Sequence, residues 1–363
     1  MNKKSKIFLI ILSVIFIVII GVLVVILYKS KLEGKPDLTM SENDTQNDKK
    51  IIFDNTKDEN TLEWYNGNDR PIAVMIDNHS QAMPHAGLSK AYLVYEIIVE
   101  GGESRLMALF KGQNLDKIGP VRSSRHYFLD YAMENDAIYV HYGWSPEAES
   151  DIKEYGINNI NGIYDDSYFS RVKDKVAPHN AVISTKKILE AAKAKNYRTT
   201  STAKPVLNYV TDEVDLGNNA QSANIVKFSY SAANTVKWEY DSQNKVYERY
   251  SKGKKEVEWD TGKEVTVKNI IIEFIKNTDL TTSADDEKKG RQTMTTTGIK
   301  DGYYITNGKA IKITCEKTSR KAKTVYKDQN GNEINVNDGN TFIEICPIDS
   351  NVKFESNEEK EGE

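Results

Sequence analysis

Residues 95–110 read YEIIVEGGESRLMALF, two apolar runs separated by a pair of glycines. A Gly-Gly pair between such runs is typical of a β-hairpin, because glycine readily adopts the positive φ angles that a tight turn requires. A two-residue turn at Gly101 and Gly102 predicts that Glu100 lies directly opposite Glu103. The stretch therefore predicts two neighbouring antiparallel strands with a charged turn.

The same pairing sorts the side chains of the hairpin between two faces, since successive residues point to opposite sides of a sheet. The predicted polar face carries Glu96, Ile98, Glu100, Glu103 and Arg105, and the predicted core face carries Tyr95, Ile97, Val99, Leu106, Ala108 and Phe110. Crowded carboxylates raise the pKa of one member, which suits a general acid for a glycosidic oxygen. The other interpretation is a solvated tip whose charges prevent pairing with another sheet edge.

The segments around the hairpin predict the fold class. Strands are predicted at 72–76, 91–99, 105–110 and 137–142, and helices are predicted to begin after the caps Ser123 or Ser124, Ser145 and Ser184. Short alternating segments follow Tyr197, with Asn-Gly pairs that predict hairpins. The fold class is therefore α+β, with a mixed α/β N-terminal domain at 69–204 and a mainly β domain at 205–350.

The two ends of the chain differ from this central part. Residues 7–28 carry no charge and are long enough to cross a membrane as one helix. Three lysines in the short tail at 1–6 predict a cytoplasmic N-terminus, which makes this helix a single-pass anchor with the later domains outside the cytoplasm. The polar composition of 29–68 predicts a disordered linker, and that of 351–363 predicts a disordered acidic tail.

The charge of the chain and its motifs argue against nucleic acid, metal ions and cofactors as partners. Beyond residue 35 the chain carries 43 basic and 52 acidic residues, a formal charge of −9, so nucleic acid is not an expected partner. The five histidines show neither HxxxH nor HxH spacing, and no nucleotide-binding motif occurs, so neither a metal nor a cofactor is predicted. Cys315 and Cys346 either form a disulfide or stay buried as thiols.

Polar residues after the hairpin are candidates for substrate binding. Arg122 and Arg125 lie three residues apart near a helix start, where they share a face and can hold a carboxylate or a phosphate. His141 and Trp144 offer a titratable ring and an aromatic platform for a sugar. The predicted binding residues are Arg105, Arg122, Arg125, His141, Trp144, His179 and Asn180. Capping or core roles are the alternative for the two helix-start arginines and for His141.

The chain resembles the YerB-like lipoproteins, two-domain extracytoplasmic proteins of Gram-positive bacteria whose function is unknown. YEIIVEGGESR, IGPVRSSRHYFLDYA, HYGWSPEA and RVKDKVAPHNAVIS carry the resemblance in the first domain, and NIIIEF and NGNEINVNDGNTFIEI carry it in the second. The matching positions are Glu96, Glu100, Gly101, Arg105, Gly119, Pro120, Arg122, Ser123, Arg125, Gly143, Ser145, Pro178, His179 and Asn180. The family varies at Glu103, and this chain lacks the lipid-accepting cysteine and has Cys315 where the family tends to have tryptophan.

Together these features predict a membrane-anchored envelope enzyme that cleaves peptidoglycan glycan strands, as a lytic transglycosylase or a glycan hydrolase. Because the resemblance omits Glu103, Glu100 becomes the favoured catalytic acid, and Glu96 is the second candidate. Arg105 is expected to set the charge of Glu100. The alternative is a non-catalytic protein that binds peptidoglycan or another cell-wall glycan, or that assembles with envelope or division proteins.

Overall fold

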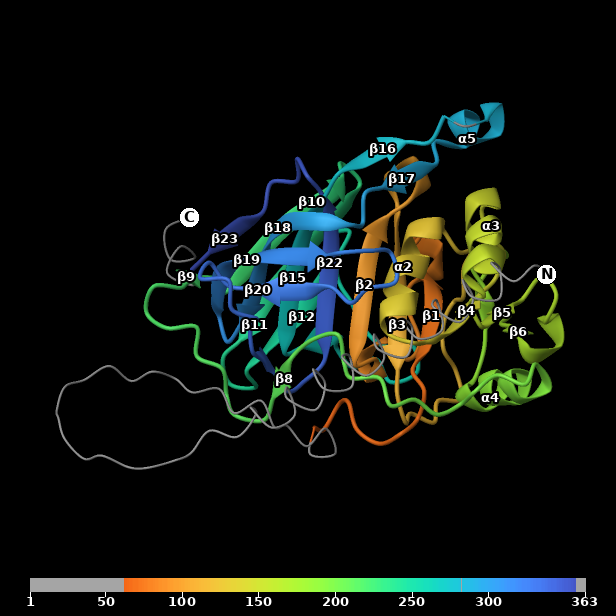
Figure 1. Cartoon of the computed structure of the whole chain (residues 1–363), viewed down its shortest axis with the longest axis horizontal. Helices are drawn as coiled ribbons and strands as arrows, with labels where there is room; N and C mark the ends of the chain where they lie inside the picture. Colours follow the sequence, from red (N-terminus) through yellow and green to blue (C-terminus); the bar gives the residue numbers. More distant parts are fainter. Residues whose placement is uncertain (1–61, 282, 357–363) are drawn as a thin grey trace, which may run out of the picture. The chain divides into compact units, whose positions relative to one another are not determined.

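Three strands near the start of the described chain have both faces buried: β1 (Ile72–Asp77), β2 (Leu93–Ile98) and β3 (Ser104–Phe110). Their apolar side chains point alternately into two cores, one on each side of the sheet. The computed structural model describes residues 62–281 and 283–356, which form a mixed α/β fold made mostly of sheet (Figure 1).

The three strands belong to an 11-stranded sheet that takes strands from both halves of the chain. Its strands, in pairing order, are β20 (Val325–Lys327), β19 (Lys309–Lys317), β18 (Gly298–Thr306), β15 (Asn269–Ile275), β22 (Thr341–Pro347), β2, β3, β1, β4 (Ile138–His141) and β5 (Asn159–Asn161), with β9 (Gln221–Ser222) on β19. β22 pairs in parallel with β2 on one side and with β15 on the other. The two domains predicted at 69–204 and 205–350 therefore share one sheet.

The remaining strands form smaller sheets. A six-stranded sheet contains β13 (Lys254–Lys255), β12 (Val246–Ser251), β11 (Asn234–Asp241), β10 (Ile225–Ser231) and β23 (Lys353–Glu355), with β14 (Thr266–Val267) on β12. Three two-stranded ladders join β16 (Asn277–Asp279) to β17 (Gln292–Met294), β21 (Val336–Asn337) to β8 (Tyr209–Val210), and β6 (Ser170–Arg171) to β7 (Ala181–Val182). The α-helices of the described residues are α2 (His126–Glu134), α3 (Pro146–Tyr155), α4 (Thr185–Ala194) and α5 (Ala284–Lys289).

The large sheet is covered on both faces. α2 and α3 pack on one face, where Tyr127 and Tyr131 join Tyr95 and Met107 in a shared core. α4 and the six-stranded sheet cover the other face, with Trp238 in that core. The β16–β17 ladder with α5 at its tip projects as an arm beyond the large sheet, close to α2 (Figure 1).

The ends of the described chain are more ordered than expected. Leu62 and Tyr65, inside the predicted linker at 29–68, are buried, and the Tyr65 hydroxyl donates to the Ala203 carbonyl at 2.7 Å. Residues 353–355, inside the predicted tail at 351–363, form β23 against β10. No helix within 62–281 or 283–356 is both long and apolar enough to cross a membrane, and the predicted anchor at 7–28 lies outside the described residues.

The predicted hairpin forms, but its register is wrong by one residue. Ile97 pairs with Arg105, and the Val99 amide donates to the Glu103 carbonyl at 2.7 Å across a three-residue turn at Glu100–Gly102. A three-residue loop shifts every facing pair, and a shift by one residue moves each side chain of a strand to the opposite face. Glu96 and Arg105 consequently lie on opposite faces of the sheet.

Local signals predicted the starts of α3 and α4 correctly, whereas α2 begins after Arg125 and not after the predicted caps Ser123 or Ser124. Ser145 caps α3 by accepting from the Ala148 amide at 3.3 Å, and Ser184 caps α4 in the same way from Lys187 at 3.2 Å. Asn307 and Gly308 have positive φ angles between β18 and β19, as predicted for an Asn-Gly hairpin. Cys315 and Cys346 are both free and buried.

Candidate functional site

A cleft of about 320 Å³ lies where the β2–β3 turn meets the end of β1 and the start of α2. Its lining residues are Asp77, His79, Val99, Glu100, Glu103, Ser104, Arg105, Arg122, Arg125, His179 and Lys289. We call it the arginine cleft, because three arginines from two segments converge on it. Lys289 comes from α5, so the arm of the C-terminal half contributes to a site that the N-terminal half builds.

One wall of the arginine cleft is built around Glu100. The Arg125 Nε donates to Glu100 Oε1 at 2.7 Å, and an Arg105 terminal nitrogen lies 3.7 Å from Oε2. Burial opposes ionisation of Glu100, but the guanidinium groups of Arg125 and Arg105 outweigh it and hold the pKa of the carboxyl below its usual range. The pKa shift is opposite to the one predicted for a general acid, because arginines rather than carboxylates surround this group.

The other wall is built around Asp77. Its Oδ2 accepts from His179 Nδ1 at 2.7 Å and pairs with Arg122 Nε at 3.2 Å, while Oδ1 accepts from the His79 amide at 3.1 Å. The rings of His79 and His179 stack with their centroids 4.5 Å apart. A carboxylate at the end of β1 thus orients one histidine and one arginine toward the same space.

Glu96 does not belong to this cleft, which corrects its assignment as a candidate acid. The side chain is 0% exposed and points to the opposite face of the sheet, where it pairs with the buried Arg249. Ser104 donates to Glu96 at 2.5 Å and Asn78 donates at 3.0 Å. These bonds satisfy the carboxylate inside the core, where no substrate reaches it.

Three other predicted binding residues also lie outside the cleft. His141 is fully buried, with Nδ1 2.8 Å from the Gly143 carbonyl and Nε2 3.1 Å from Asn159. Asn180 closes the β6–β7 ladder by accepting from Arg171 at 2.8 Å. Trp144 lies in tilted ring contacts with His141 and Tyr164 and does not line the cleft. Local contacts therefore engage the polar groups of His141 and Asn180 and the ring of Trp144 away from the cleft.

Sequence reasoning did not name Asp77, His79 or Lys289 among the site residues, although all three line the cleft. Asp77 follows a buried strand, and His79 lies two residues beyond it, a spacing that brings both to one sheet edge. Those positions carried a usable signal, because a polar residue at the end of a buried strand marks a place where a site can form. Lys289 carried none, since only tertiary structure brings α5 to the cleft.

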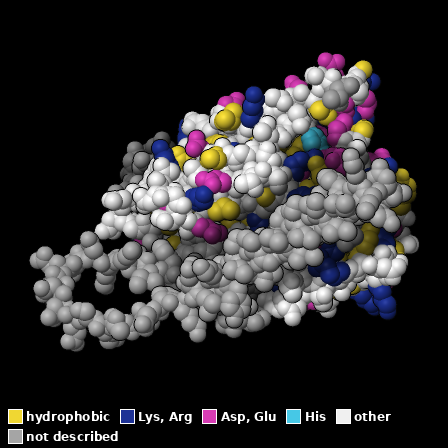
Figure 2. Space-filling model, in the orientation of Figure 1, with side chains coloured by type: hydrophobic (Ala, Val, Ile, Leu, Met, Phe, Trp, Pro, Cys, Tyr) yellow, Lys and Arg dark blue, Asp and Glu magenta, His cyan; other side chains and the backbone are white. Residues whose placement is uncertain are grey.

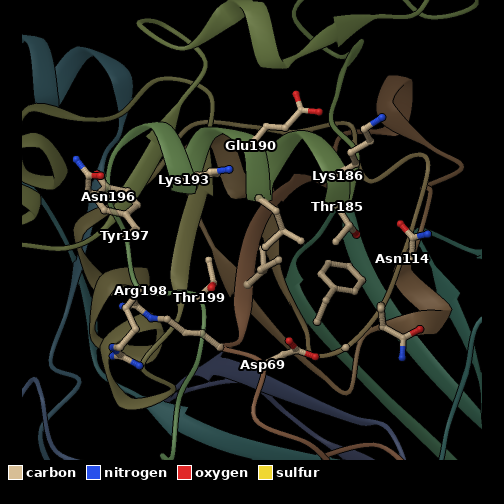
Figure 3. A pocket seen from close by; sticks show the side chains of 16 residues that line it. Asp69, Asn114, Thr185, Lys186, Glu190, Lys193, Asn196, Tyr197, Arg198 and Thr199 are labelled. Atoms are coloured by element: carbon tan, nitrogen blue, oxygen red, sulfur yellow. The ribbon is translucent and has the colours of Figure 1, made fainter.

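A larger pocket of about 1070 Å³ lies between α4 and the far ends of β1 and β3. Figure 3 shows Lys186, Glu190 and Lys193 projecting from α4 on one side, with Asp69 on the other. Among the described residues that line it there is no histidine and none of the predicted site residues. We therefore regard the arginine cleft as the candidate site.

Neither wall of the cleft amounts to a metal-ligand set. Across residues 62–281 and 283–356, no three His, Cys, Asp or Glu side chains are grouped so that they could hold a metal ion. The arrangement instead offers hydrogen-bond donors with positive charge, which suits the recognition of an anion.

Comparison with known proteins identifies the class of this two-part fold. Residues 60–198 match the N-terminal domain, and residues 226–343 the C-terminal domain, of a protein family of unknown function (DUF3048). The chain therefore belongs to the YerB-like family.

Two relatives are informative. The chain is 35% identical over 214 residues to the "Putative lipoprotein YerB" of Bacillus subtilis (strain 168), an alignment that covers 56% of this chain and 61% of that protein. The chain thus spans about three fifths of that relative. The crystal structure of the YerB protein from Bacillus subtilis superposes with a TM-score of 0.69 at 30% identity, over 79% of this chain and 94% of that one.

Proposed function

We propose that this chain is an extracytoplasmic, membrane-associated envelope protein that binds an anionic group of peptidoglycan or another cell-wall glycan in the arginine cleft. The single observation that carries the proposal is the set of three arginines facing one cleft of about 320 Å³. The description of its relative as a putative lipoprotein supports the membrane association.

Arg122 is the group best placed to bind the anion. Only its Nε takes part in an ion pair, with Asp77, and no residue of the described chain hydrogen-bonds its two terminal nitrogens. A guanidinium fork of this kind holds two oxygens of a carboxylate or a phosphate at once. Arg105 and Arg125 add positive charge but are partly engaged by Glu100.

The lining of the cleft combines acidic with basic side chains, so its positive charge is local. On the face drawn in Figure 2, basic and acidic side chains are interspersed, and acidic groups gather at the end of the arm where α5 lies. A site that relies on a few converging donors, rather than on a broad basic surface, selects a discrete anionic group.

The test is sedimentation of the full chain, purified in detergent, with isolated cell walls. We expect the wild type to pellet with the walls, the variant Arg122→Ala to stay in solution, and the control Arg198→Ala to behave as the wild type. Arg198 is an exposed arginine that pairs with Asp136 outside the cleft. Equal sedimentation of all three proteins would contradict the proposal.

The same assay examines glycan cleavage, which stays a prediction. If Glu100 acts as an acid, the wild type releases soluble muropeptides and Glu100→Gln does not, while Glu103→Gln serves as the control. The pKa of Glu100, held low by its arginines, favours binding over proton donation. We therefore expect sedimentation without release.

A further inference from the structure

We propose that the arginine cleft hydrolyses a phosphate diester, with His179 as the general base and Asp77 as the residue that positions it. The inference rests on the proposed function, because it takes the same cleft as the binding site and names the anionic group. It depends on the wall of the cleft that is built around Asp77. The sequence predicted Arg122 and His179 of that wall as binding residues, but not Asp77 or His79.

The tautomer of neutral His179 follows from its partner. A carboxylate oxygen only accepts hydrogen bonds, so the Nδ1 that lies 2.7 Å from Asp77 Oδ2 carries the hydrogen. The neutral ring then has an unprotonated Nε2, and no residue of the described chain hydrogen-bonds that atom. An oriented histidine with a free lone pair in a cleft is the arrangement a general base requires.

His79 has the opposite tautomer. Its Nδ1 accepts from the Gln81 amide at 3.2 Å, so Nδ1 is unprotonated and the hydrogen lies on Nε2. Within 62–281 and 283–356 no partner is found for this Nε2. The two stacked rings therefore offer one acceptor, on His179, and one donor, on His79.

The donors suit a tetrahedral anion. One guanidinium fork satisfies a planar carboxylate, but here donors come from two segments, the Arg122 fork and the His79 Nε2, while Arg105 on β3, which donates to the Ser123 carbonyl at 2.6 Å, adds positive charge. Phosphoryl oxygens point in several directions and can use donors from both segments. A phosphate group therefore fits the set better than a carboxylate does.

The charge balance favours a diester over a monoester. Lys252 neutralises Glu103, and Asp285 neutralises Lys289 through a 2.8 Å hydrogen bond. The rest of the cleft then holds three arginines against the carboxylates of Asp77 and Glu100. The surplus of one positive charge matches the single negative charge of a phosphate diester.

The step balances without a co-reactant other than water. His179 Nε2 takes a proton from water as the water oxygen forms a bond to phosphorus, and the bond from phosphorus to the leaving alkoxide breaks. The alkoxide takes a proton from solvent, and His179 returns its proton to solvent. Arg122 and His79 hold the non-bridging oxygens throughout.

The experiment uses the full chain in detergent with bis(4-nitrophenyl) phosphate and follows the release of 4-nitrophenolate. We expect hydrolysis by the wild type and a loss of about 100-fold or more in His179→Gln. His126→Gln is the matched control, because His126 contacts Thr293 and does not line the cleft. Asp77→Asn should lower the rate and also shift the pH–rate profile, which a merely structural role would not do.

Binding of dimethyl phosphate, measured by calorimetry, separates this inference from the proposed function. His179→Gln should still bind the diester while it fails to hydrolyse the chromogenic one. A wild type that binds dimethyl phosphate but hydrolyses nothing, or a His179→Gln as active as the wild type, overturns catalysis and leaves the binding site. Absence of both binding and hydrolysis overturns this inference, whereas the proposed function fails only if the wild type and Arg122→Ala sediment equally with cell walls.

Discussion

At the residue scale, the arginine cleft depends on how neighbours set the charge of individual groups. Glu100 keeps its negative charge because Arg125 and Arg105 compensate for its burial. Glu100 in turn stabilises the charged form of Arg105. Burial lowers the pKa of Arg105 to about 10, and the negative charge of Glu100 opposes that shift. Removing either charge therefore affects both partners.

Substitution of Glu100 should destabilise the fold. Glu100→Gln removes a charge-assisted interaction from a side chain that is 18% exposed, so we expect the free energy of unfolding to fall by about 2 kcal/mol at pH 7. Because the pKa of Glu100 is lowered in the fold, its contribution is present at neutral pH and is lost as the pH falls through the folded pKa. Urea denaturation at pH 7 measures the effect.

Glu103→Gln is the control, since Glu103 pairs with Lys252 on a side chain that is 36% exposed. Its loss should cost less than about 1 kcal/mol. A larger effect for Glu103→Gln than for Glu100→Gln would contradict this account of the cleft wall.

His141 should make the fold sensitive to acid. Burial lowers the pKa of His141 from 6.5 to about 4, so the unfolded chain binds a proton in this pH range while the folded chain does not. The free energy of unfolding should therefore decrease as the pH falls from 6.5 toward 4, with a share from His141 of about 2 kcal/mol at pH 5. In His141→Gln, the difference in stability between pH 7 and pH 5 should shrink by that amount. An unchanged difference would show that the ring is not buried in its neutral form.

At the element scale, the β2–β3 turn fixes the position of Glu100. Gly101 and Gly102 both have positive φ angles, but only Gly102 touches another element, since a Cβ there would lie 2.8 Å from Ser231 Cβ. The Ser231 hydroxyl donates to the Gly102 carbonyl at 2.8 Å. The turn is thereby held against the β10–β11 hairpin.

The two glycines form a matched pair for mutation. Gly101→Ala should cost about 1 kcal/mol, the strain of a positive φ for alanine, because a Cβ there meets no atom within 4 Å. Gly102→Ala should cost clearly more, since the backbone must also move away from Ser231. Thermal unfolding of both variants checks this order, and equal losses would indicate that the approach to Ser231 is not close.

Sequence patterns predicted the elements better than they predicted register. Ser145 and Ser184 mark helix starts correctly because capping is a local interaction. The hairpin register depends on loop length, which Gly-Gly does not specify, and the error of one residue placed Glu96 on the same face as Arg105. At the site, Glu100 and the arginines were predictable, whereas Lys289 required tertiary structure.

At the scale of the whole molecule, a buried polar cluster joins the two family domains. Arg249, between the two large sheets, pairs with Glu96 of the first domain and with Glu256, and all three side chains are almost fully buried. His85 Nδ1 lies 2.5 Å from Glu256. The shared sheet and this cluster predict that both domains unfold in one transition.

Loss of Arg249 should be severe. Arg249→Leu leaves the carboxylates of Glu96 and Glu256 buried without their guanidinium partner, which should lower the free energy of unfolding by about 3–5 kcal/mol. Lys255→Ala is the control, because its pairs with Glu248 and Glu264 are largely solvated and should contribute less than about 1 kcal/mol. Denaturation followed by tryptophan fluorescence measures the free energy of unfolding of both variants.

The same denaturation of the wild type, followed by tryptophan fluorescence and by circular dichroism, counts the unfolding transitions. Two separate transitions would contradict the prediction that both domains unfold together.

The most direct test of the central claim is the affinity of the full chain for dimethyl phosphate at low ionic strength, measured by isothermal titration calorimetry for the wild type and for Arg122→Ala. The account predicts binding to the wild type and an affinity at least about tenfold lower in Arg122→Ala, because the free guanidinium fork is lost. Equal affinity in the two proteins, or no binding to the wild type, would contradict it.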